Sequence, residues 1–160
     1  MPARGSKSKK GSGASSASRT PREPTFFIDK CLGLHVVPDA LRACGANVEL
    51  KTDHFAPDTK DTDWLPVVGR NGWVILTKDK RLRHNHLEVV SLLRAGTASF
   101  ILTSGNFSGQ EMADAFVRAM PHMKKMLLKF PPPFIATVPK GGVPRLQYTF
   151  DGLIRKVSSP

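Results

Sequence analysis

Cysteine is scarce in this sequence, and long apolar runs are absent. The two cysteines among 160 residues, Cys31 and Cys44, do not form a C-x-x-C pair and lack the partner cysteines of a zinc site. We therefore expect both to be small buried residues of a reducing compartment. No apolar run is long enough to span a bilayer, and the N-terminus lacks the apolar core of a secretory signal. These absences predict a cytoplasmic protein without membrane contact.

Acidic residues are outnumbered by basic ones. The chain has 24 Lys and Arg against 13 Asp and Glu, a formal net charge of +11 and a pI near 10.1. Such an excess favours polyanionic partners, of which nucleic acid is the commonest. Nearly half of it lies in residues 1–24, which lack aromatic residues and periodic apolar positions. We expect this segment to be a disordered basic tail, either a solvated extension or an electrostatic arm for RNA or DNA.

Apolar strand patterns alternate with helical patterns at least four times along the rest of the chain. Strands are expected at residues 26–29, 47–50, 73–76 and 98–102, with helices between them. Ser108 and Glu111 have the spacing of a capping box, so a long helix should begin there, with Pro121 kinking or restarting it. The pattern predicts an α/β fold, with a mainly parallel sheet of about four to five strands flanked by helices.

The chain divides into three expected segments. Residues 1–24 form the tail, residues 25–138 the α/β domain, and residues 139–160 a C-terminal edge strand or hairpin with its own tail. The first strand is followed by Cys31-Leu32-Gly33 and not by a glycine-rich phosphate loop. That disfavours a nucleotide-binding doubly wound domain.

Carboxylates follow the expected strands. Asp29 ends the first strand, and Asp79 comes shortly after the strand at residues 73–76. If these strands are parallel, both side chains converge at the edge of the sheet where ligands bind in open α/β folds. Residues 51–63 add Asp53, Asp58, Asp61 and Asp63, which is more than helix capping explains.

Converging carboxylates indicate a cation site. Like charges raise one another's pKa, so several cannot stay ionised together without a cation, and oxygen ligands without paired Cys or His suit Mg²⁺ or Mn²⁺. Such an ion activates water and neutralises a phosphodiester. A basic loop beside Asp79 would hold the phosphate backbone through Lys78, Lys80, Arg81 and Arg83. Ser104 and Asn106, after the strand at residues 98–102, would orient a metal-bound water or form a plain turn. These features predict a metal-dependent nuclease, although strand-end aspartates also serve as turn caps.

Four segments resemble, in order and spacing, the PIN-like domain family, in particular the small PIN-like ribonuclease toxins of bacterial toxin–antitoxin systems. They are Phe26-Phe27-Ile28-Asp29, Asp53-His54-Phe55 with Asp61-Thr62-Asp63-Trp64-Leu65, Trp73 to Asp79, and Leu102 to Asn106. The resemblance implies RNA cleavage with Mg²⁺ or Mn²⁺. Asp29 matches the first-strand acid, Asp79 the Thr-x-Asp acid and Asp61 the acid that opens the intervening helix, with Asp63 as its alternative.

The resemblance also implies partners and leaves one position open. It implies a small antitoxin protein and a possible homodimer. Many relatives carry another acid shortly after the Thr-x-Asp motif, where this chain has Lys80, Arg81 and Arg83. A fourth ligand is therefore Asp63, Asp58 or Asp53, or is absent. The alternative function is a non-catalytic nucleic-acid-binding module with the same fold.

Overall fold

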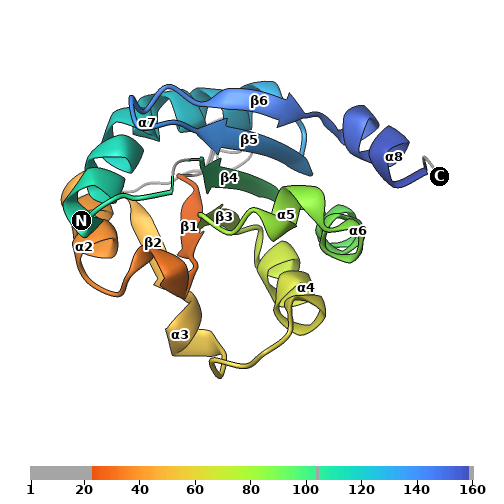
Figure 1. Cartoon of the computed structure of the whole chain (residues 1–160), viewed down its shortest axis with the longest axis horizontal. Helices are drawn as coiled ribbons and strands as arrows, with labels where there is room; N and C mark the ends of the chain where they lie inside the picture. The colour runs from red at the N-terminus through yellow and green to blue at the C-terminus, as the bar shows by residue number, and fades with distance from the viewer. Residues whose placement is uncertain (1–22, 104, 159–160) are drawn as a thin grey trace, which may run out of the picture.

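One mixed sheet organises the chain. The computed structural model describes residues 23–103 and 105–158, so the expected tail lies outside the described residues apart from its last two positions. Six strands form the sheet in the order β2-β1-β3-β4-β5-β6 (Figure 1). Their bounds are β1 Thr25–Ile28, β2 Asn47–Leu50, β3 Val74–Thr77, β4 Ala98–Leu102, β5 Phe134–Val138 and β6 Arg145–Tyr148. Neighbouring strands are parallel except β5 and β6, which are antiparallel. This confirms the predicted α/β class, with one strand more than expected.

Helices connect the parallel strands and cover both faces of the sheet (Figure 1). They are η1 Lys30–Leu32, α2 Val36–Ala43, α3 Lys51–His54, α4 Asp61–Asn71, α5 Arg81–His84, α6 His86–Ala95, α7 Gly109–Lys129 and α8 Phe150–Ser158. The predicted capping box at Ser108 and Glu111 begins α7. Among the helices of the described residues, none combines the length and the apolarity that a membrane span needs.

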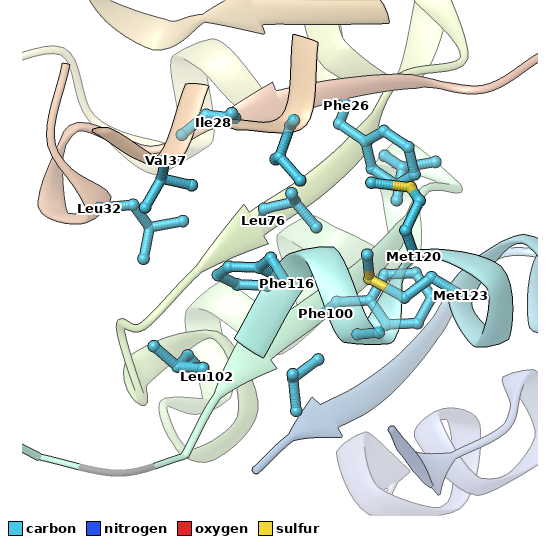
Figure 2. Packing of buried hydrophobic residues seen from close by; sticks show 14 of the residues in the cluster. Phe26, Ile28, Leu32, Val37, Leu76, Phe100, Leu102, Phe116, Met120 and Met123 are labelled. Carbon is cyan, nitrogen blue, oxygen red and sulfur yellow. The ribbon is translucent and has the colours of Figure 1, made fainter. Parts of the chain in front are cut away.

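The side chains of the strands alternate between two hydrophobic clusters, as the pleat requires. On one face, Phe26, Ile28 and Leu76 pack with Phe100 and with the α7 residues Phe116, Met120 and Met123 (Figure 2). On the other face, Phe27 and Ile75 pack with residues of α4, α6 and α8: Trp64, Leu65, Val68, Val89, Leu92 and Leu153. The sheet is therefore buried on both sides, and its edges are the places where polar groups can gather.

Three local expectations need correction. The helix α7 runs without interruption across Pro121, so the proline does not restart it; Phe116, Ala119 and Met123 are fully buried on either side, and their packing offsets the lost hydrogen bond. The C-terminal segment forms the expected hairpin strand, but α8 follows it and was not predicted. Cys31 is half-buried and Cys44 is exposed, so the expectation of burial is wrong for Cys44.

Gly69 lets α4 approach α6 closely. A Cβ atom at this position would collide with the carbonyl oxygen of Ala95, at the end of α6. Both helices belong to the face that carries Trp64 and Leu92. The absence of a side chain at residue 69 therefore sets the distance between α4 and α6.

We predict that Gly69→Ala lowers the free energy of unfolding by about 1–3 kcal/mol, because the added methyl group forces the two helices apart. Urea denaturation followed by circular dichroism measures the change. Gly141→Ala is the matched control, since nothing lies within 4 Å of a Cβ added there. If both variants are equally stable, α4 and α6 do not pack as closely as described.

Candidate active site

The register of β1 and β3 brings two predicted site residues to one edge of the sheet. Ile28 pairs with Leu76 in the parallel ladder, and the Asp29 amide donates to the Leu76 carbonyl at 3.1 Å. Thr77 therefore lies beside Asp29. Its hydroxyl donates to Asp29 Oδ2 at 2.8 Å and accepts from the Asp79 amide at 3.0 Å. One buried hydroxyl thus links the two strand-end aspartates.

Asp61 joins these residues in a single pocket. The pocket has a volume of about 510 Å³ and is lined by residues of η1, α3, α5 and the start of α4 and of the loops before these helices, among them Asp29, Asp58, Asp61 and Asp79. The Trp64 indole donates to Asp61 Oδ1 at 2.7 Å, which orients that carboxylate within the first turn of α4. The three aspartates matched by the resemblance therefore face one space, although they are far apart in the sequence.

Lys51 compensates the charge of Asp29. It follows β2, whose last residue Leu50 pairs with Ile28, so Lys51 and Asp29 leave neighbouring strands at the same level. Lys51 Nζ lies 3.6 Å from Asp29 Oδ1, and both side chains are only 12% exposed. The same ammonium lies 4.5 Å from the ring centroid of Trp64. A buried pair of this kind is costly to break from one side, because the remaining charge is left without a partner.

Arg81 compensates the charge of Asp79. Its Nε lies 3.1 Å from both carboxylate oxygens, and its Nη2 donates to Oδ2 at 2.7 Å. These hydrogen bonds hold the pKa of Asp79 below its usual value. Arg81 Nε also lies 3.8 Å from Glu88 Oε1, so the guanidinium is shared between two acids.

Glu88 is an acid of this site that the sequence reasoning did not select. It lies on α6 and lines a second pocket, which adjoins the first through Asp61 and Arg81. Burial, and next the Asp61 carboxyl group, raise the pKa of Glu88 to about 7. Its Oε2 is buried and has no hydrogen-bond partner among the described residues. Glu88 is therefore protonated in part near neutral pH, and a cation beside it would favour its ionised form.

The remaining predicted residues lie elsewhere or are not described. Asp63 is exposed in the first turn of α4 and does not line the pocket that contains Asp29, Asp61 and Asp79, which we call the acidic pocket. Asp53 is exposed on α3. Asn106 is exposed, and Ser104 lies outside the described residues. The water-orienting role suggested for this pair stays a prediction. Arg83, in the predicted basic loop, lines a different pocket from Arg81.

The donor chemistry of the pocket is that of a hard cation site, but the acids are already compensated. Asp29, Asp61 and Asp79 offer only oxygen atoms, which Mg²⁺ and Mn²⁺ prefer. Within the described residues, no three His, Cys, Asp or Glu side chains are grouped so that they could hold a metal ion as they stand. Lys51 and Arg81 supply the positive charge in this arrangement.

Lys51 and Glu88 are the two residues of the site that the sequence patterns did not single out, and each has a signal in the sequence. Lys51 follows a strand, as Asp29 does, and could have been found by the same strand-end argument. Glu88 has a weaker signal, because its place beside Asp61 depends on how α4 packs against α6, which periodicity does not give.

Comparison with known proteins identifies relatives of this chain. The sequence profile of the PIN-like domain matches residues 24–104, half of the chain. A protein of Mycobacterium tuberculosis (strain ATCC 25618 / H37Rv), named as a candidate ribonuclease, VapC45, is 26% identical over 117 residues, which cover 71% of this chain and 84% of the relative. No solved structure matches the chain at a comparable level of significance.

We predict that Thr77→Val lowers the free energy of unfolding by about 1–3 kcal/mol, because it leaves a buried Asp29 oxygen and the Asp79 amide without their shared partner. Denaturation in urea measures the loss. Thr77→Ser keeps the hydroxyl and is the matched control. Equal stability of the two variants would show that the hydroxyl link is dispensable.

The raised pKa of Glu88 predicts a pH-dependent stability in the presence of EDTA. Between the unfolded value, near 4.5, and about 7, the folded chain binds more protons than the unfolded chain, so this residue makes stability fall as the pH rises. Glu88→Gln removes the titration, so the variant should gain stability relative to the wild type from about pH 5 to about pH 7 and level off above it.

Glu111→Gln is the control for this measurement. The contact of Glu111 with Lys140 lowers the pKa of this carboxyl group to about 2. Its contribution to the free energy of unfolding is therefore lost only on acidification below about pH 4.5. The difference between Glu111→Gln and the wild type should be constant from about pH 5 to about pH 8. A constant difference for Glu88→Gln as well would refute the raised pKa.

Proposed function

Because the chain belongs to the PIN-like domain family, we propose that it is a metal-dependent endoribonuclease. The observation that carries the proposal is the meeting of Asp29, Asp61 and Asp79 in one pocket at the carboxyl edge of the parallel strands. The relative named as a ribonuclease supports RNA as the substrate class, and the net charge of +11 suits a polyanion.

The acids of the pocket would hold Mg²⁺ or Mn²⁺. Asp29, Asp61 and Asp79 are the proposed ligands, and Glu88, beside Asp61, is a better fourth donor than the exposed Asp63. Asp61 and Glu88 lie beside each other in a partly buried site, and a cation that compensates both carboxylates is therefore favoured. Binding requires Arg81 to release Asp79, because its hydrogen bonds occupy both oxygens of that carboxylate.

The ion, when bound, would supply an activated water and neutralise charge on the scissile phosphodiester. The residues of the chain prepare the site for that chemistry. Thr77 fixes Asp29, and Lys51 keeps a positive charge 3.6 Å from it, next to the space that a phosphate would enter. Arg81, once released from Asp79, presents two parallel donors of the kind that bind phosphate. Lys78 and Lys80 are proposed as further backbone contacts.

We also propose a biological setting from the family resemblance. The nuclease would be the toxin of a toxin–antitoxin pair, with a small antitoxin protein as its partner, a cytoplasmic location and a possible homodimer. The candidate ribonuclease of Mycobacterium tuberculosis supports the catalytic part of this proposal. Co-purification with the product of an adjacent small open reading frame would test the partner.

A non-catalytic nucleic-acid-binding module is the second candidate function. It is favoured by one observation: Lys51 and Arg81 already neutralise Asp29 and Asp79, so the described arrangement needs no metal ion. The two candidate functions predict different results for RNA cleavage when EDTA is added or when one of the site's aspartates is replaced. A nuclease stops cutting, whereas a binding module never cuts.

We predict that the wild type cleaves single-stranded RNA in Mn²⁺ and that EDTA or Asp29→Asn reduces the rate more than about 100-fold, because each removes part of the metal site. RNA binding by Asp29→Asn should be unchanged or tighter, since the variant loses a negative charge. Gel electrophoresis and fluorescence anisotropy measure the two properties.

Asp39→Asn is the matched control, because Asp39 is exposed on α2 and its removal should leave cleavage unchanged. Circular dichroism must show that Asp29→Asn folds, since the substitution leaves Lys51 without its partner. Cleavage that survives both EDTA and Asp29→Asn removes the metal hypothesis. Binding without cleavage by the wild type in Mn²⁺ supports the second candidate.

A further inference from the structure

A third pocket, also polar, lies at the same edge of the sheet, beyond the acids. It has a volume of about 440 Å³, and none of its lining residues is acidic. They come from α5, from the ends of β4 and β5 and from the start of β6: Arg83, Thr103, Thr137, Pro139, Arg145, Leu146 and Gln147. Because β6 is antiparallel to its neighbour β5, with Thr137 opposite Arg145, its first residue lies where the parallel strands end.

Arg83 is held in this pocket and not in the acidic one. Its Nη1 donates to Gln147 Oε1 at 3.1 Å, a contact across 64 positions that fixes the guanidinium against β6. Its Nε is buried and has no hydrogen-bond partner among the described residues. No described carboxylate forms an ion pair with Arg83, so its charge is solvated only in part and is not neutralised.

Arg145 adds a second positive charge. It is exposed at the first position of β6, and none of the described carboxylates pairs with it. Two guanidinium groups in one pocket repel each other unless an anion lies between them. Thr103, Thr137 and Gln147 supply neutral polar groups around the same space. Such a set suits phosphate, because the guanidinium fork matches its oxygen atoms.

The position of the pocket indicates which phosphate it would bind. The pocket lies at the ends of β4, β5 and β6, which are one to three strands from β3, and strands are about 4.8 Å apart, so it extends roughly 5–14 Å from the end of β3, with Arg145 at its far side. An RNA strand whose scissile phosphate lies at Asp79 would reach it after a few nucleotides. We propose that this pocket binds an RNA backbone phosphate remote from the cleaved bond; the RNA assignment rests on the proposed nuclease function.

A remote phosphate contact contributes equally to the bound substrate and to the transition state. Loss of such a contact raises KM and leaves kcat unchanged. The contact also exists only for RNA that is long enough to span both pockets. These two properties distinguish the pocket from a part of the cleavage site and from a general attraction by the basic surface.

Binding of single-stranded RNA to the full chain in EDTA tests the proposal. For an oligonucleotide of about ten residues, Arg145→Ala should weaken binding about 10-fold and reduce the slope of log affinity against log salt by about 1. For a dinucleotide, the same variant should bind as the wild type does. In Mn²⁺, Arg145→Ala should raise KM for the longer RNA only.

Arg70→Ala is the matched control, because Arg70 is exposed near the end of α4, at the opposite edge of the sheet. It removes the same charge and should change binding less than about 2-fold. Equal losses in Arg145→Ala and Arg70→Ala overturn the proposal. Equal losses for the dinucleotide and the longer RNA overturn it as well, because Arg145 would then act at the cleavage site.

Titration with inorganic phosphate separates this inference from the proposed function. The Nε–H resonances of Arg83 and Arg145 should shift in the NMR spectrum, and that of Arg70 should not. If no RNA is cleaved but these resonances shift and Arg145→Ala weakens binding of the longer RNA, the nuclease fails and the subsite stands. A phosphate shift without any RNA binding overturns the RNA assignment. If RNA is cleaved and neither resonance shifts, the subsite fails and the nuclease stands.

Discussion

The parallel pairing of β1 with β3 is the constraint on which the site depends. The register that sets Ile28 against Leu76 also sets Asp29 beside Thr77, and the Thr77 hydroxyl then reaches the Asp79 amide. A slip of one residue would turn Phe27 out of its cluster with Trp64 and would move Asp29 away from this hydroxyl. Hydrophobic burial on both faces therefore fixes the position of a polar contact at the edge.

The same edge collects charges of both signs, because every parallel strand ends there. Lys51 follows β2, Asp29 follows β1, and Asp79 follows β3. Lys51 pairs with Asp29, whereas Arg81 is shared between Asp79, at 2.7 Å, and Glu88, at 3.8 Å, and the Asp61 carboxylate accepts a hydrogen bond from the Trp64 indole. Burial, and next the Asp61 carboxyl group, raise the pKa of Glu88, and the shared Arg81 does not offset them. The place where positive charge is missing lies between α4 and α6.

Sequence patterns predicted the features that depend on the strands, but they did not predict the features that depend on how the helices pack. The alternation of strands and helices gave the α/β class, and strand ends gave Asp29 and Asp79. Asp61 was singled out by the family resemblance, as the acid that opens the intervening helix. Glu88 could not be placed in that way, because its neighbourhood depends on the close approach of α4 to α6 at Gly69. The helix α8 was missed since it is short and contains Gly152.

The basic loop divides between two pockets for a geometric reason. Residues two positions apart on a helix point about 200° apart, so Arg81 and Arg83 in the single turn of α5 face different neighbours. Arg81 meets Asp79, and Arg83 meets Gln147 of β6. The strand β6 begins at Arg145, beyond the residues 24–104 that match the family. The acids at the ends of the central strands therefore belong to the part of the chain that matches the family, whereas the pocket proposed for a remote phosphate combines Arg83 and Thr103 of that part with Thr137, Pro139 and the first residues of β6 beyond it.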